Sequence, residues 1–107
     1  MRRLLPLVLL ICATAAQAED AAALRLRALA ATCAGCHGTE GRAPRDSLVP
    51  GLAGMPAAHF LVQMKAFQNG ARQGTLMPQL AKGYTDAQIL ALAQYFAAQK
   101  PTTGTTP

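Results

Sequence analysis

The chain has 107 residues, which is enough sequence for one small domain, and its formal net charge is +5. Its Lys and Arg residues are scattered rather than gathered in a dense basic stripe, and this pattern excludes a typical nucleic-acid-binding domain. Trp is absent and aromatic residues make up only 5% of the chain, so little bulk is available for a core. Domains of this size often need a metal, a disulfide or a cofactor, and we expect a large apolar prosthetic group.

The N-terminal segment has the features of a secretory signal peptide. Arg2 and Arg3 precede an apolar run at residues 4–16, and alanines flank Gln17 where that run ends. A charged start, a short apolar stretch and small residues at the exit predict cleavage before Glu19 and a periplasmic location. Because the run is shorter than the about 20 residues of a membrane span, we expect no span after cleavage; an uncleaved anchor is the alternative.

The rest of the sequence divides into a domain at residues 19–100 and a Thr-rich tail at residues 101–107. We expect the tail to be disordered. Without residues 1–18 the chain keeps eight of ten Lys and Arg and all five Asp and Glu, a formal charge of +3.

Two helices are predicted in the first part of this domain. The first begins with Asp20 as N-cap and runs through Ala-rich sequence to about Thr32. The second begins at Pro56, where a missing N–H costs nothing, and stops at Gly70. Its inner face consists of apolar residues at helical spacing, which are Phe60, Met64 and Phe67.

The third predicted helix has the clearest start in the sequence. Thr85 and Gln88 have the spacing of a capping box, and Pro101 ends the helix. Its apolar face consists of Ile89, Leu92, Ala93 and Phe96. Residues 38–54 and 74–83 lack periodicity and are predicted loops, long enough to wrap something. No segment alternates like a β-strand, so the predicted fold class is all-α, with three principal helices.

Cys33, Cys36 and His37 form the C-x-x-C-H pattern of covalent haem c attachment. On a helical turn, residues three apart lie on one side about 5–6 Å from each other, so both sulfurs can reach the vinyl groups at one porphyrin edge. His37 is the next residue and can place its imidazole on the iron. The pattern therefore predicts one covalent haem with His37 as an axial ligand.

Other interpretations of these three residues explain less of the sequence. A thioredoxin-like site would need a βαβ context, which is missing. A zinc site would need a fourth ligand, and only His59 is spare. A disulfide between Cys33 and Cys36 leaves His37 unexplained.

The second axial ligand must come from Met55, Met64, Met77 or His59. Met64 shares the apolar face of a helix, where a Met is usually core packing, and Met55 precedes that helix. His59 lies off the apolar face and is expected to be an exposed or a capping histidine. Met77 lies in a predicted loop with Pro78 directly after it, which would stiffen the loop. We therefore predict Met77 as the second ligand.

A His/Met pair is usual in electron-transfer cytochromes. With both axial positions filled, no position is open to oxygen or peroxide, and the predicted function is transfer of single electrons rather than catalysis. The alternative is a haem enzyme or gas sensor with a displaceable sixth ligand. A non-haem dithiol or zinc-binding module is a third possibility.

The sequence resembles the class I c-type cytochromes over nearly all of residues 21–100. The resemblance rests on residues 33–38, on residues 49–54, on Met77-Pro78 and on the last helix with Tyr95-Phe96. It implies a small fold wrapped around one haem.

The same resemblance implies two contacts around the haem. The first and last helices would cross near Leu29 and Phe96. A proline carbonyl would hold the second nitrogen of the haem-ligating histidine, and Pro50 is the counterpart in this sequence.

Residues 60–67 and 81–86 are similar to the monohaem cytochrome subunit of flavocytochrome c sulfide dehydrogenases. This similarity implies a flavin-containing sulfide dehydrogenase subunit as the redox partner, with the chain itself as its electron acceptor. His59 departs from the pattern, because relatives often carry a tyrosine at this position.

Overall fold

Helices make up most of residues 5–102, which are the residues described by this computed structural model; side chains are described from residue 17. Arg2, Arg3 and residues 103–107 of the predicted tail lie outside the described residues. The elements in chain order are α1 (Leu5–Ala31), α2 (Ala34–His37), the 3-10 turn η1 (Thr39–Gly41), α3 (Ala57–Asn69), α4 (Met77–Ala81) and α5 (Asp86–Ala97).

The predicted all-α fold is confirmed, since the described part of the chain contains no strand. Its three principal helices are α1, α3 and α5, of 27, 13 and 12 residues. Two short helices, α2 and α4, are added to them. None of the helices within residues 5–102 combines the length and the apolar character needed to cross a membrane.

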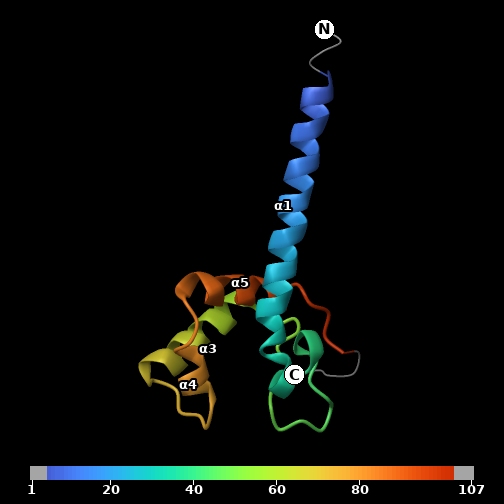
Figure 1. Cartoon of the computed structure of the whole chain (residues 1–107). Helices are drawn as coiled ribbons and strands as arrows, with labels where there is room; N and C mark the ends of the chain where they lie inside the picture. Colours follow the sequence, from blue (N-terminus) through green and yellow to red (C-terminus); the bar gives the residue numbers. More distant parts are fainter. Residues whose placement is uncertain (1–4, 103–107) are drawn as a thin grey trace.

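The predicted start of the first helix at Asp20 is wrong. α1 begins at Leu5 and passes through Asp20 without a break, so that it extends away from the other helices (Figure 1). Leu and Ala dominate residues 5–19 and have high helix propensity, and the one proline there, Pro6, lies in the first turn. An Asp at a possible N-cap therefore does not start a new helix when the preceding residues continue the old one.

The other two predicted helices are close to their expected bounds. Pro56, the predicted first residue, is the N-cap of α3, so the helix begins one residue later, at Ala57, and Gly70 ends it in the left-handed conformation with φ 81°. The capping box of α5 is confirmed, since Gln88 N donates to Thr85 Oγ1 over 3.2 Å and Thr85 N donates to Gln88 Oε1 over 2.9 Å.

The prediction of a loop at residues 74–83 is wrong in its middle, where α4 forms. Pro78 lies in the first turn of α4, where its ring and missing N–H are compatible with a helix. A five-residue helix is too short for apolar periodicity to be visible in the sequence. The other predicted loop, at residues 38–54, is irregular apart from η1.

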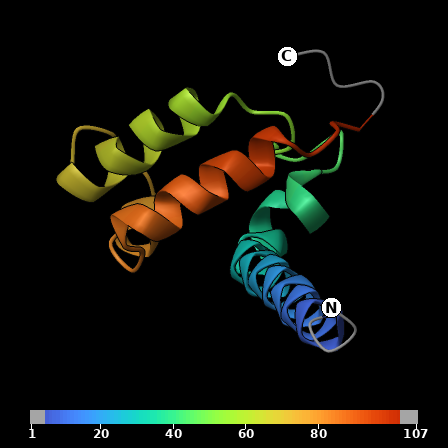
Figure 2. The ribbon, with the colours of Figure 1, turned by 90° about the horizontal axis from the view of Figure 1, so that it is seen from above.

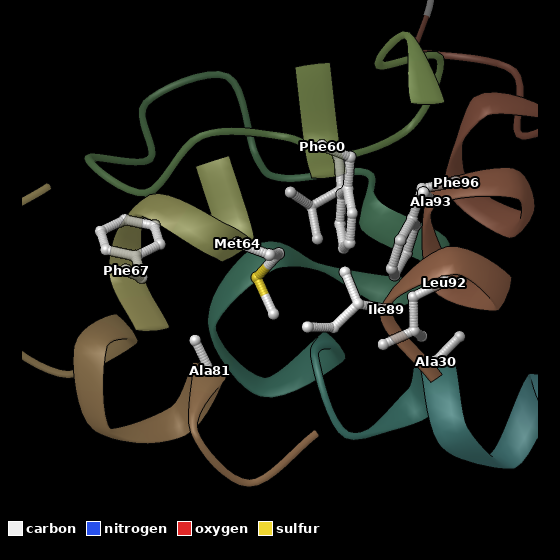
Figure 3. Packing of buried hydrophobic residues seen from close by; sticks show 10 residues of the cluster. Ala30, Phe60, Met64, Phe67, Ala81, Ile89, Leu92, Ala93 and Phe96 are labelled. Carbon is white, nitrogen blue, oxygen red and sulfur yellow. The ribbon is translucent and has the colours of Figure 1, made fainter. Parts of the chain in front are cut away.

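The core lies between α3 and α5, which run side by side (Figure 2). The end of α1 contacts α5 as the family resemblance implied, through the buried Ala30 and the half-buried Leu29. The rings of Phe60 and Phe96 stack with their centroids 5.7 Å apart. The buried residues, drawn as sticks in Figure 3, are Ala30, Leu52, Phe60, Met64, Phe67, Ala81, Ile89, Leu92, Ala93 and Phe96.

Candidate functional site

The C-x-x-C-H residues lie at the junction of α1 and α2. Cys33 is the N-cap of α2, and Cys36 and His37 are its last two residues. Cys33 N donates to Ala30 O over 3.1 Å and His37 N donates to Cys33 O over 2.9 Å, so helical bonds continue through the motif. Both cysteines are free thiols, and Cys36 is exposed. The two sulfurs are therefore available for covalent attachment from one helical turn.

The environment of Cys33 differs from that of the exposed Cys36. Cys33 packs against the core, and this burial raises the pKa of its thiol. The neighbouring Thr32 and Tyr84 side chains lower that pKa and offset part of the rise.

His37 is held by the loop that follows it. Its Nδ1 lies 2.7 Å from Pro50 O, which is the contact that the family resemblance implied. Because a carbonyl oxygen can only accept, Nδ1 carries the hydrogen, and Nε2 of the neutral ring keeps a lone pair for a metal ion. Such a bond fixes both the tautomer and the orientation of a ligating imidazole.

Gly38 lets the chain leave α2 directly after His37. Its φ is 83°, and a Cβ at this position would lie 2.2 Å from Arg42 O. The loop then returns through Gly41, whose carbonyl accepts hydrogen bonds from Leu52 N over 2.8 Å and from Ala53 N over 3.1 Å. These bonds close the loop at residues 41–53 and bring Pro50 back to the imidazole.

The loop is also tied to α5. Gly54 N donates to Phe96 O over 2.8 Å, and Arg42 Nε donates to Lys100 O over 2.8 Å. Arg42 makes an ion pair with Glu40 as well. The support of His37 therefore reaches α5, whose buried residues belong to the core, rather than ending in the loop.

Met77 comes from a separate element, α4, which lies on the opposite side of Figure 1 from α2. Its side chain is half-buried and packs against the core. Its neighbours Leu76 and Leu80 are 61% and 50% exposed, so they leave apolar surface beside Met77. An apolar group beside Met77 would cover them.

The other candidates for the second ligand have different surroundings. Met64 is only 5% exposed and lies inside the core next to Phe60 (Figure 3). Met55 is half-buried and packs against the core. His59 is exposed, as expected, on the first turn of α3. Met77 remains our prediction for the second ligand.

The donor set fits haem c and does not fit zinc. Among the residues whose side chains the structure describes, no three His, Cys, Asp or Glu side chains converge as a metal-binding cluster. Two free thiols on one turn and an imidazole with a fixed Nδ1–H are the groups that haem c attachment needs. Cys33, Cys36, His37 and Pro50 are thus brought together, whereas Met77 lies on a separate helix, α4.

Comparisons with known proteins agree with this donor set. No protein-family model matches the chain. Cytochrome c-553 of Nitratidesulfovibrio vulgaris is 32% identical over 106 residues, which cover 91% of this chain and 98% of that protein. The chain belongs to the class I c-type cytochromes. Members of this family are electron-transfer proteins with covalently bound haem c.

Two further relatives of this cytochrome have names that include a dehydrogenase. The cytochrome subunit of sulfide dehydrogenase from Chlorobaculum tepidum is 40% identical over 68 residues, or 64% of this chain and 60% of that protein. The thiosulfate dehydrogenase electron acceptor of Thiomonas intermedia is 39% identical over 72 residues, or 67% of this chain. The cytochrome spans only 33% of that second relative.

Three polar residues near the site were not found from the sequence. Gln68 on α3 donates to Ala81 O and Tyr84 O, and the Tyr84 hydroxyl lies 2.7 Å from Thr32 Oγ1. We call these contacts the Gln68–Tyr84–Thr32 link. In the sequence, the only sign of this link is the polar Gln68, which directly follows Phe67 on the buried side of a predicted helix. The position of Gln68 does not show which groups accept its hydrogen bonds.

Proposed function

We propose that this protein is a periplasmic cytochrome that carries single electrons on one haem c, attached through Cys33 and Cys36 and ligated by His37 and Met77. The observation that carries the proposal is the hydrogen bond from His37 Nδ1 to Pro50 O, directly after two free thiols on one turn. This arrangement presents Nε2 as a ligand in a fixed orientation. The predicted signal peptide at residues 1–18 supports the periplasmic location.

The proposed ligands explain why the protein would transfer electrons without binding substrates. When bound, the haem iron alternates between the ferrous and ferric states by one electron. His37 is held by Pro50, and Met77 is held by the packing of α4 against the core. Ligands that stay in place in both states keep reorganisation small, and a thioether ligand raises the potential.

The absorption spectrum of the exported protein, matured with haem, tests this proposal. We expect a low-spin c-type spectrum with the weak long-wavelength band of a ferric-iron–methionine bond. A c-type spectrum without that band would contradict Met77 ligation. Rapid binding of carbon monoxide at neutral pH would then favour the alternative, a haem enzyme or gas sensor with a displaceable sixth ligand. A mature protein with free thiols and no haem would contradict the whole proposal.

For the partner, we propose a flavin-containing sulfide dehydrogenase subunit that donates electrons to this cytochrome. The support is the similarity at residues 60–67 and 81–86 and the name of the Chlorobaculum tepidum relative. In this arrangement the flavoprotein oxidises sulfide and the cytochrome only accepts electrons. Co-purification of the holo-protein with a flavin-containing chain is the expected result. Recovery of the holo-protein alone, with no stable partner, would favour a diffusible carrier.

A further inference from the structure

The helix that begins with Met77 cannot hold its own position. α4 has five residues, and isolated helices shorter than about 12 residues are marginal in water. Its orientation must therefore come from contacts with other elements. One contact is the burial of its last residue, Ala81, which is 0% exposed and lies close to Met64 and Phe67 (Figure 3).

Gln68 makes the second contact with the end of α4. Its Nε2 donates to Ala81 O over 2.9 Å and to Tyr84 O over 3.1 Å. A side-chain amide has two donor hydrogens, so both bonds can form at the same time. The carbonyl groups at the end of a helix have no donor within that helix, and Gln68 supplies one from α3. α4 is thereby fixed to a principal helix at the end opposite Met77.

Tyr84 connects the same turn to the residue before the first haem-attaching cysteine. The Thr32 hydroxyl donates to Leu29 O over 2.7 Å, which uses its only hydrogen. The hydrogen bond of 2.7 Å between Thr32 Oγ1 and the Tyr84 hydroxyl must therefore be donated by Tyr84. This bond joins the end of α1, beside Cys33, to the turn that follows α4.

We propose that Gln68 and Tyr84 are positioning residues for Met77, a proposal that rests on Met77 being the second axial ligand. The Gln68–Tyr84–Thr32 link holds α4 at a fixed place relative to α3 and to the cysteine that attaches the haem. With the link intact, Met77 would be held in place as a ligand whenever the haem is bound. Without it, α4 moves more easily and Met77 dissociates more often.

Ligand exchange on the ferric holo-protein measures this effect directly. Imidazole at high concentration replaces a dissociated methionine, and the loss of the long-wavelength band gives the rate. We expect Gln68→Leu to increase that rate roughly tenfold, since it removes one hydrogen bond to the end of α4 and one to the turn that follows it. Tyr84→Phe removes one hydroxyl with little change in shape, and we expect an increase of roughly threefold to tenfold.

Matched controls separate positioning from general stability. Gln94→Leu makes the same substitution at an exposed position of α5, and Tyr95→Phe removes the hydroxyl of the other tyrosine. Both are expected to exchange at the wild-type rate. A variant that lowers the melting temperature without changing the exchange rate would show a merely structural role and would overturn the proposal.

The experiment also distinguishes the two proposals from each other. If the wild-type protein lacks the long-wavelength band, Met77 ligation itself fails. If the band is present and neither Gln68→Leu nor Tyr84→Phe speeds its loss, the positioning role alone fails. If Gln68→Leu does not retain haem, Tyr84→Phe decides the question, because an unchanged rate in that variant counts against the link.

Discussion

The two sides of the proposed haem site are held in place by different kinds of contact. On the His37 side, backbone groups make the support, since the Gly41 carbonyl closes the loop that returns Pro50 to the imidazole. On the Met77 side, side chains make it, through Gln68 and the Tyr84 hydroxyl. Backbone hydrogen bonds survive most changes of side chain, but they are disturbed when a Cβ is added at a glycine with no room for it. Side-chain hydrogen bonds are lost when the one residue that makes them is replaced.

Removal of both cysteines that would attach the haem is expected to have the largest effect. In the double variant Cys33→Ser with Cys36→Ser, no sulfur remains to form a thioether bond. We expect complete loss of covalent haem, measured by haem staining of the denatured protein on a gel. The single variant Cys36→Ser is the control and should keep one attachment. Haem that stays on the denatured double variant would rule out attachment at this motif.

Met77→Ala breaks the Met77 side alone. The thioether bonds and His37 remain, so we expect covalent haem without the long-wavelength band, and open access of added ligands to the iron. The potential should fall by on the order of 0.1 V, because axial ligands set haem potentials over a range of about 0.8 V.

The control for Met77→Ala is Met64→Leu, a change of similar volume in the core that should keep the band. If the spectrum and the potential of Met77→Ala equal those of the wild type, Met77 is the wrong residue.

Gly41→Ala tests the backbone support on the His37 side. A Cβ at Gly41 would lie 2.8 Å from Ala53 N, 2.8 Å from Leu52 Cβ and 2.9 Å from Phe96 Cδ1, at a φ of 76°. We expect the free energy of unfolding to fall by about 2–4 kcal/mol in urea titrations of the holo-protein. Gly70→Ala is the matched control, because Gly70 has a φ of 81° and no atom within 4 Å of the added Cβ. Its cost should be only about 1–2 kcal/mol; equal costs would mean that crowding at Gly41 is unimportant.

Thr85→Ala, at the N-cap of α5, should have the smallest effect. It removes the hydroxyl that accepts from Gln88 N at the start of α5, just after the turn that holds Tyr84. Loss of an N-cap costs about 1 kcal/mol, and urea titration should show that decrease. Thr75→Ala, at an exposed position outside any helix, is the control and should leave the stability within experimental error. No difference between the two variants would mean that the cap is not important to the stability of α5.

The features that could be predicted from the sequence are those whose interacting residues are close together along the chain. The capping box of Thr85 and Gln88 and the stop at Gly70 are local patterns, in which the interacting groups lie within a few residues, and both are found where expected. The residues of the C-x-x-C-H motif are equally local, and they lie on one helical turn.

Contacts between distant segments could not be predicted in this way. Gln68 and Tyr84 are 16 residues apart, and Thr32 and Tyr84 are 52 residues apart. No local pattern links such residues, because the packing of α3, α4 and α5 decides which of them meet. The error at Asp20 has another cause, since a possible cap was weighed without the helix-forming residues before it.

The unbroken course of α1 has a consequence for the proposed processing. Cleavage before Glu19 would make a new helix start in the middle of a preformed helix, and Glu19 and Asp20 would then occupy its first turn. Two carboxylates beside the positive end of the helix macrodipole are favourable, each by about 0.3–1 kcal/mol, and they offset the charge of the new amino terminus. In the precursor the same two residues lie far from either helix end. The pair would therefore stabilise α1 only after export is complete.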